Sequence, residues 1–341
     1  MEVPQVSRGG ASPAAGSGSR LAYHATAMTR TVSRRATSSA VAGLLSALLL
    51  LPFLPSCHGA SPGRPGSLAP ELIEKIRAGG VLASDPSARY VLELQGPDDL
   101  PLVPVTLNGR GPFLLLLDFG ANVVVLRPDT AERAGIEVLV EREGTDVGRA
   151  ETMEIAGQLA YTDVHVGIDE GLRDVAGVVG FNVLRFASSR WDGPARRLEI
   201  SPAIGVAADQ AGSVPLKIES RMPYLQVRSG ETELWANLDT GAAEWFTVPE
   251  ADRGAFSWRD VREGPVTYNN QTGEQRVESA VFVPGLDVGT ETLSGFPVYI
   301  NPDADTPWFG MSLLRHCITT LDLEAERALL ECELPPGLPT N

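Results

Sequence analysis

The chain carries one loop sequence twice. Residues 115–121 read Leu-Leu-Leu-Asp-Phe-Gly-Ala, and residues 236–242 read Ala-Asn-Leu-Asp-Thr-Gly-Ala. In both places an apolar run ends in Asp-x-Gly-Ala, so Asp118 and Asp239 occupy matching positions. Repetition of this kind constrains a fold more strongly than any single motif, because each copy predicts one similar structural unit.

Two further anchors follow in the same order. Residues 178–184, Val-Val-Gly-Phe-Asn-Val-Leu, match residues 308–314, Trp-Phe-Gly-Met-Ser-Leu-Leu. Asp192 then matches Asp322 with the same spacing between the copies. Three ordered anchors indicate an internal duplication, and 341 residues are enough for two units of ordinary domain size.

The local pattern is mainly that of β-strands. Residues 89–204, and again residues 214–333, alternate short runs rich in Leu and β-branched residues with Gly, Pro, Asn and Asp. This alternation predicts many short strands joined by turns. Helical periodicity predicts helices only over 70–78 and 128–134.

The domain organisation follows from the repeat and from the composition of the N-terminal segment. We predict an N-terminal extension and signal peptide over 1–56, and a tether with a short helix over 57–88. The first lobe is predicted over 89–206 and the second over 207–341. Since both lobes lie on one chain, we expect a monomer.

The second loop, Asp239-Thr240-Gly241-Ala242, resembles the active-site loop of the pepsin-like and retropepsin-like aspartic proteases. The first loop, Asp118-Phe119-Gly120-Ala121, resembles a degenerate copy of it, and the resemblance covers residues 100–331. It implies a mainly β, bilobal acid-protease fold whose two β lobes are related by a pseudo-twofold axis. It further implies hydrolysis of a peptide or protein substrate.

The resemblance assigns the catalytic pair to Asp118 and Asp239. Two carboxyls about 3 Å apart cannot both ionise, so they share one proton and can serve together as acid and base toward one water molecule. The family resemblance also assigns supporting roles in the two loops to Gly120, Ala121, Asn122, Thr240, Gly241 and Ala242. In the family a hairpin closes over the substrate, and by position the corresponding stretches are 141–157 and 268–279, with Gly144, Gly148 and Gly273 as turn candidates.

The first loop departs from the family pattern at Phe119. Family members carry Thr or Ser after each catalytic Asp, and its hydroxyl bonds to the backbone of the opposite lobe. Thr240 can form such a bond and Phe119 cannot. The Phe119 side chain then either packs into space opened by a compensating change or displaces the first loop. Two functions stay open: aspartic-type hydrolysis, and a catalytically impaired protein that binds peptides.

Other chemistries find little support in the sequence. The net charge of −15 disfavours nucleic-acid binding, which requires clustered basic residues. The sequence has no Gly-x-Ser-x-Gly elbow, no His-Glu-x-x-His motif and no Cys/His cluster, so we expect neither a metal nor a cofactor. His165 and His316 are expected to be structural or surface residues.

The N-terminal segment predicts export. A basic stretch after Met28, an apolar run over 41–54 and small residues before Cys57 are typical of a secretory signal. The segment around Cys57 resembles a bacterial lipobox, which implies lipidation of Cys57, a membrane anchor and a location in the cell envelope. The alternative is an ordinary signal with an incidental cysteine.

The other two cysteines, Cys317 and Cys332, form an even pair in a protein expected to be exported. They flank two apolar arms that turn around residues 324–326. We therefore predict a disulfide between them across a hairpin.

Overall fold

The computed structural model describes residues 69–142, 145–172, 174–256, 259–268, 275–282, 285–302 and 304–335. The predicted signal, Cys57 and most of the tether lie outside these ranges. No helix among the described residues is long and apolar enough to cross a membrane.

Both predicted helices are present with the predicted bounds. They are α1 (Pro70–Ala78) and α2 (Pro128–Ala134), and the structure adds the short helices α3 (Met311–Leu314), η1 (Phe181–Val183) and η2 (Glu250–Ala255). Each predicted helix begins with proline and ends before a left-handed glycine, Gly79 or Gly135. These are the residues that favour helix starts and stops, because proline lacks an N–H and glycine adopts positive φ without strain.

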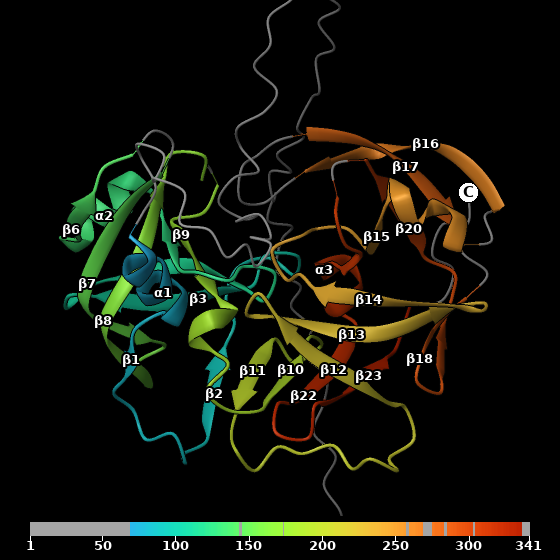
Figure 1. The fold of residues 1–341 in the computed structure, drawn as a ribbon, viewed down its shortest axis with the longest axis horizontal. Helices are drawn as coiled ribbons and strands as arrows, with labels where there is room; N and C mark the ends of the chain where they lie inside the picture. Colours follow the sequence, from blue (N-terminus) through green and yellow to red (C-terminus); the bar gives the residue numbers. More distant parts are fainter. Residues whose placement is uncertain are drawn as a thin grey trace, which may run out of the picture. The chain divides into compact units, whose positions relative to one another are not determined.

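The rest of the described chain is mainly β, as predicted. The strands of the first half are β1 (Val81–Leu82), β2 (Tyr90–Glu93), β3 (Leu102–Leu107), β4 (Arg110–Asp118), β5 (Val125–Leu126), β6 (Glu137–Val140), β7 (Thr145–Ile155), β8 (Leu159–Asp169), β9 (Gly177–Gly180), β10 (Ser189–Asp192) and β11 (Arg197–Ile200). Eight of them form a sheet in the order β1-β8-β5-β9-β4-β3-β7-β6, which a further β7–β8 pairing closes on itself. Figure 1 shows these strands in green and cyan.

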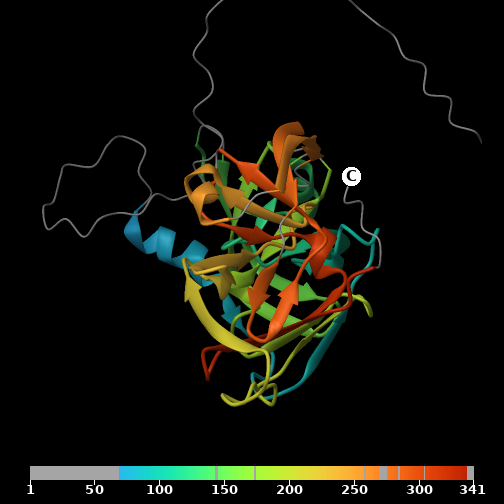
Figure 2. The same ribbon diagram turned by 90° about the vertical axis from the view of Figure 1, so that its right-hand side faces the viewer.

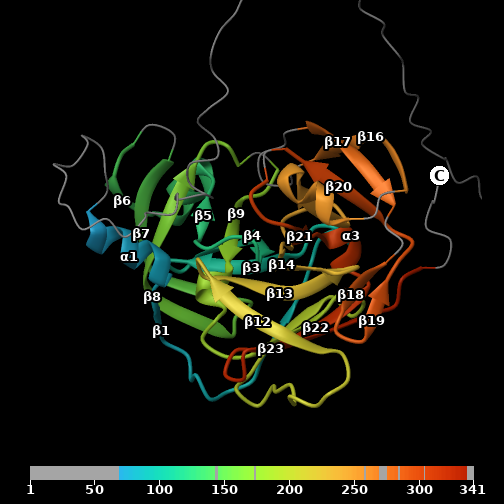
Figure 3. The same cartoon turned by 45° about the vertical axis from the view of Figure 1, so that its right-hand side comes forward.

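The second half contributes a larger sheet. Its strands are β12 (Ser213–Glu219), β13 (Met222–Ser229), β14 (Thr232–Leu238), β15 (Phe246–Pro249), β16 (Arg259–Tyr268), β17 (Gln275–Phe282), β18 (Leu286–Val288), β19 (Glu291–Leu293), β20 (Pro297–Asn301), β21 (Trp308–Phe309), β22 (Cys317–Asp322) and β23 (Arg327–Cys332). The main path of the sheet runs β16-β17-β20-β15-β21-β14-β13-β12-β23-β22-β10-β11-β2. Figure 3 shows the second-half strands in yellow to red.

The duplicated anchors build the same substructure in both halves. The strand that ends in the aspartate pairs in parallel with the strand of the apolar-apolar-Gly step, β4 with β9 and β14 with β21. A Cβ on Gly180 would lie 2.4 Å from the carbonyl oxygen of Val123, and one on Gly310 would lie 2.3 Å from that of Glu244. Both positions therefore require glycine, because the returning loop passes too close for any side chain.

The third anchor belongs to strands that join the two halves. β10 pairs antiparallel with β22, and Asp192 lies opposite Ile318. Asp192 accepts a hydrogen bond from the Ala195 amide (3.0 Å), and Asp322 accepts one from the Ala325 amide (3.0 Å). The matched aspartates thus cap the turns of equivalent hairpins, and Figure 1 shows these strands running between the two halves. The predicted domain boundary at 206/207, which lies between β11 and β12, stays a prediction.

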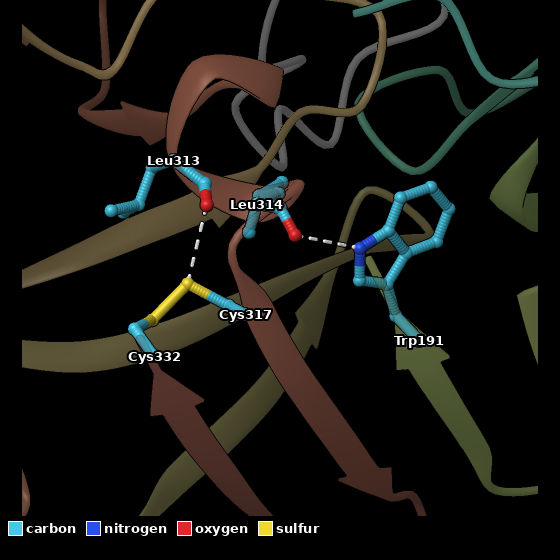
Figure 4. Close-up of a disulfide and its surroundings, with 5 residues drawn as sticks. All are labelled: Trp191, Leu313, Leu314, Cys317 and Cys332. Carbon is cyan, nitrogen blue, oxygen red and sulfur yellow. Dashed lines mark hydrogen bonds between the residues drawn. A yellow bond between two sulfur atoms is a disulfide. The ribbon is translucent and has the colours of Figure 1, made fainter. Parts of the chain in front are cut away.

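The predicted disulfide is present. Cys317 and Cys332 lie directly opposite one another on β22 and β23, with an S–S distance of 1.99 Å. Cys317 is fully buried, and its sulfur lies 3.3 Å from the carbonyl oxygen of Leu313 (Figure 4). The bridge therefore lies directly beside α3, the short helix that follows the second glycine step.

Candidate active site

Asp118 and Asp239 come together at the ends of β4 and β14. A Cβ on Gly120 would lie 2.5 Å from Cγ of Asp239, so the two loops touch at this point and residue 120 has to be glycine. Asp118 is completely buried, whereas Asp239 is partly exposed. Of the two residues, Asp239 is therefore the one nearer to solvent.

The two carboxyls differ in the number of hydrogen bonds that they accept from backbone amides. Oδ1 of Asp118 accepts hydrogen bonds from the amides of Gly120 (2.7 Å) and Gly241 (3.1 Å). The Gly241 amide also donates to Oδ1 of Asp239 (3.0 Å). One amide of the second loop thus contacts both carboxyls, and Asp118 receives the larger share of the donors.

The surroundings move the pKa of both carboxyls upward. Burial raises the pKa of Asp118 to about 6, against the opposing effect of its backbone donors and of a hydrogen bond with Asp239. Burial, followed by the negative charge of Asp118, raises the pKa of Asp239 well above its usual range. The two carboxyls therefore titrate as a coupled pair, in which ionisation of Asp118 favours the protonated form of Asp239.

Thr240 binds the second loop to the first. Its buried hydroxyl donates to the carbonyl oxygen of Leu117 (2.8 Å) and accepts a hydrogen bond from the Phe119 amide (3.0 Å). These two bonds span both sides of Asp118 in sequence. The position of the first aspartate is therefore tied directly to the second loop.

Replacing Thr240 by Val should destabilise the protein by about 1–3 kcal/mol, because a buried amide and a buried carbonyl lose their partner. Urea denaturation measures this. The matched control is Thr247→Val, since Thr247 is also fully buried but its hydroxyl has no hydrogen-bond partner within the described ranges. Equal losses in the two variants would contradict the role of the Thr240 hydroxyl.

Phe119 packs beneath the first loop. Its buried ring lies 5.0 Å from that of Phe181 and 6.0 Å from that of Trp191, centroid to centroid. The indole Nε1 of Trp191 donates to the carbonyl oxygen of Leu314 in the second half (3.0 Å; Figure 4). Phe119 thus belongs to an aromatic cluster that one hydrogen bond ties to the second half of the chain.

Trp191 is the residue of this site that the sequence did not reveal. It precedes the matched Asp192, but its counterpart in the second copy is Leu321, so the repeat itself carries no sign of its role.

The other loop residues form equivalent pairs. The carbonyl of Ala121 accepts a hydrogen bond from the Phe181 amide (2.8 Å), and that of Ala242 accepts one from the Met311 amide (2.7 Å). Asn122 follows Ala121 and is partly exposed. These contacts fix each loop to the short helix of its own half.

Two hairpins correspond to the predicted closing segments. β6 pairs with β7, and β16 pairs with β17. Gly148 lies within β7 opposite Val138, so its prediction as a turn residue is wrong. Gly144 and Gly273 lie outside the described residues.

The histidines are engaged elsewhere. His165 is buried on β8, where its Nδ1 contacts the carbonyl oxygen of Asp163 (3.2 Å). His316 stacks on Trp245 with 5.7 Å between ring centroids. In the described part of the chain, no group of three or more His, Cys, Asp or Glu side chains is placed to hold a metal ion.

Part of this chain is similar to a known protein family. Residues 103–183 match the family model described as aspartyl protease, a range that includes Asp118 and Gly180. Among solved structures, an aspartic proteinase from Irpex lacteus is 12% identical with a TM-score of 0.44, covering 72% of this chain and 97% of its own. A retropepsin-like aspartic protease from Rickettsia conorii is 15% identical with a TM-score of 0.28, covering 33% of this chain and 89% of its own. Among curated proteins, none matches.

The family match thus indicates a hydrolase of the aspartyl protease type, and residues 103–183, which carry the first aspartate loop, are the part of the chain similar to that family.

Proposed function

We propose that this protein hydrolyses peptide bonds with Asp118 and Asp239 as a single catalytic pair. The observation that carries this proposal is the contact between two carboxyls from two separate loops, which are hydrogen-bonded to one another and both have a raised pKa. Gly120, which has no side chain, and the hydroxyl of Thr240 keep the two loops in contact.

The proposed reaction is the attack of a water molecule on the peptide bond, with the two aspartates as general base and general acid. Ionised Asp118 accepts a proton from a water molecule, whose oxygen attacks the peptide carbonyl carbon. Protonated Asp239 donates its proton to the carbonyl oxygen as the tetrahedral intermediate forms. Asp118 then gives its proton to the nitrogen, and the C–N bond breaks as Asp239 takes back a proton from a hydroxyl of the intermediate. An amine and a carboxylic acid are released, both aspartates return to their starting states, and no covalent enzyme intermediate forms.

The alternative, a peptide-binding protein that has lost catalysis through Phe119, is less favoured. Its premise is that the first loop lacks support, yet the Phe119 amide is bonded to Thr240 and the Phe119 ring is packed against Phe181 and Trp191. Both features support an intact first loop.

A peptide library tests the proposed function. Incubation of the purified protein with the library from about pH 3 to 8, followed by mass spectrometry, should give new amino and carboxyl termini at defined bonds. The same incubation with Asp239→Asn should give none. Equal product from both proteins, or none from either, would contradict aspartic-type hydrolysis.

If the two aspartates act as proposed, activity should fall at acid pH. Because Asp118 has to be ionised to accept a proton and its pKa is about 6, kcat/KM should rise with pH up to about 6 and level off above it. Initial rates on a library-derived peptide measure this. A rate that falls as the pH rises through 6 would contradict the assignment of Asp118 as the base.

The same shift predicts a loss of stability with rising pH. The pKa of Asp118 is higher in the folded state than its ordinary value of 3.8, so the folded state binds the proton more tightly than the unfolded state. This stabilisation is fully present below about pH 4 and is lost as the pH rises through about 6, at a cost of roughly 3 kcal/mol. Asp118→Asn is the control and should lack this part of the pH dependence.

We further propose that the protein acts in the cell envelope as a single chain, on peptide or protein substrates, held by a lipid on Cys57. The basic, apolar and small-residue segments before Cys57 support this location. In a bacterial host, wild-type protein should fractionate with membranes and Cys57→Ala should be released. Membrane association of the variant equal to that of the wild type would contradict the anchor.

A further inference from the structure

Three arginines from separate parts of the chain meet at one end of α1. Arg77 lies in the last turn of α1, Arg185 follows η1, and Arg221 lies in the turn between β12 and β13. Figures 2 and 3 show α1 in blue with the yellow β12–β13 strands passing beside its end. We call Arg77, Arg185 and Arg221 the arginine cluster.

One carboxylate, that of Glu74, forms ion pairs with two arginines of this cluster. Glu74 on α1 forms an ion pair with Nη1 of Arg77 through Oε1 (3.2 Å) and with Nη2 of Arg221 through Oε2 (3.1 Å). Arg185 makes no ion pair with any residue in the described ranges. The cluster therefore has more positive charge than its surroundings compensate, in a chain whose net charge is −15.

Two guanidinium N–H groups of the cluster lack acceptors. Nε of Arg185 and Nε of Arg221 are buried, and neither has a hydrogen-bond partner among the described residues. Burial, together with the positive charges of Arg185 and Arg77, lowers the pKa of Arg221 from its ordinary value. A buried donor without a partner is costly, so the arrangement lacks an acceptor, and the surplus positive charge of the cluster favours an anionic one.

The backbone at Arg221 adds an independent observation. Ser220 and Arg221 have φ of 50° and 66°, the left-handed conformation that two-residue hairpin turns usually satisfy with Asn or Gly. A long side chain in this conformation costs free energy, and strain of this kind is concentrated at functional positions. Here it holds the Arg221 side chain, 23% exposed, against Glu74 and α1.

We propose that the arginine cluster binds an oxyanion of the phosphate class, at a site separate from the aspartate pair. Guanidinium groups match the geometry of phosphate oxygens through paired N–H donors. Arg77 (35% exposed) and Arg221 leave the cluster open to solvent on one side. The phosphate is either free in solution or part of a lipid headgroup, since both present anionic non-bridging oxygens to guanidinium groups.

The test is thermal unfolding of the full chain in inorganic phosphate against chloride at equal ionic strength. Wild type should gain roughly 3–6 °C in Tm when phosphate exceeds its Kd about twentyfold. Arg185→Gln should lose this gain, while the control Arg228→Gln, an exposed arginine paired with Asp287, should keep it. Absence of a gain in wild type, or an equal gain in wild type and Arg185→Gln, would overturn the proposal.

The stability of the variant without phosphate separates binding from a structural role. Because Arg185 is an uncompensated charge beside Arg221, its replacement by Gln should leave the Tm in chloride unchanged or higher. A clear fall in the Tm of Arg185→Gln in chloride would show that this arginine serves the fold, and would overturn the proposal.

A second arm distinguishes the two sources of phosphate. Full chain carrying Cys57→Ala is mixed with vesicles of phosphatidylglycerol or of phosphatidylcholine and sedimented. Sedimentation with phosphatidylglycerol alone, abolished by Arg185→Gln, assigns the site to a lipid headgroup. If the protein stays in solution with both vesicles while phosphate still raises the Tm, the site belongs to a free phosphate compound.

Discussion

Asp239→Asn should lower kcat for a cleaved peptide by about 10³-fold or more while making the protein no less stable at pH 7. Activity falls because Asn cannot supply the proton that Asp239 gives to the carbonyl oxygen. Stability does not fall, because the variant removes a buried carboxyl whose pKa is raised chiefly by burial and then by the charge of Asp118. Steady-state kinetics and thermal unfolding measure the two effects.

The double variant tests whether the carboxyls act as a unit. Asp118→Asn should lose about as much activity as Asp239→Asn, and the variant with both changes should lose no more than either alone. Losses that add on a logarithmic scale would mean that the two aspartates act independently, contrary to one pair sharing one proton.

Gly120→Ala should reduce kcat by roughly 10²-fold or more, although it adds only one methyl group. The added Cβ would lie 2.5 Å from Cγ and 2.6 Å from Oδ1 of Asp239, which forces the loops apart or turns the carboxyl away. Displacing one carboxyl from the other removes the shared proton on which the mechanism depends. Kinetics on the same peptide measure the loss.

The matched control is Gly254→Ala. A Cβ at this position meets no atom within 4 Å, and Gly254 does not have a positive φ, so the same substitution there should leave kcat unchanged. If Gly120→Ala retained full activity, the close contact of the two loops would not be required for the reaction.

The sequence predicted those parts of the fold whose causes are local. Proline at the start of α1 and glycine after its end act within the helix itself, and the predicted bounds agree with the structure. The glycine of each apolar-apolar-Gly step is required by a carbonyl more than 50 residues away in the sequence, yet the duplication reveals it because it occurs in both copies.

Features that occur once and join distant segments could not be predicted. Trp191 reaches Leu314 across the halves, a sequence separation of 123 residues, and its counterpart in the repeat is a leucine. The space filled by the Phe119 ring likewise depends on Phe181 and Trp191. Such contacts depend on how the two copies differ, so a pattern based on their similarity does not show them.

Glycine alone was also a poor guide to turns. Gly148 lies within β7, where a Cβ would lie 2.5 Å from a side-chain carbon of Ile136 and 3.0 Å from one of Ile168. The absence of a side chain at Gly148 leaves room for these two isoleucine side chains to pack against β7. The prediction relied instead on the frequency of glycine in turns.

The most direct test of the central claim is hydrolysis of one library-derived peptide at pH 7 by wild type, Asp118→Asn and Asp239→Asn, each first shown to be folded by circular dichroism. We predict turnover by wild type at a single bond and no detectable turnover by either variant. A wild type that does not cleave any peptide, or an Asn variant that cleaves at the wild-type rate, would contradict it.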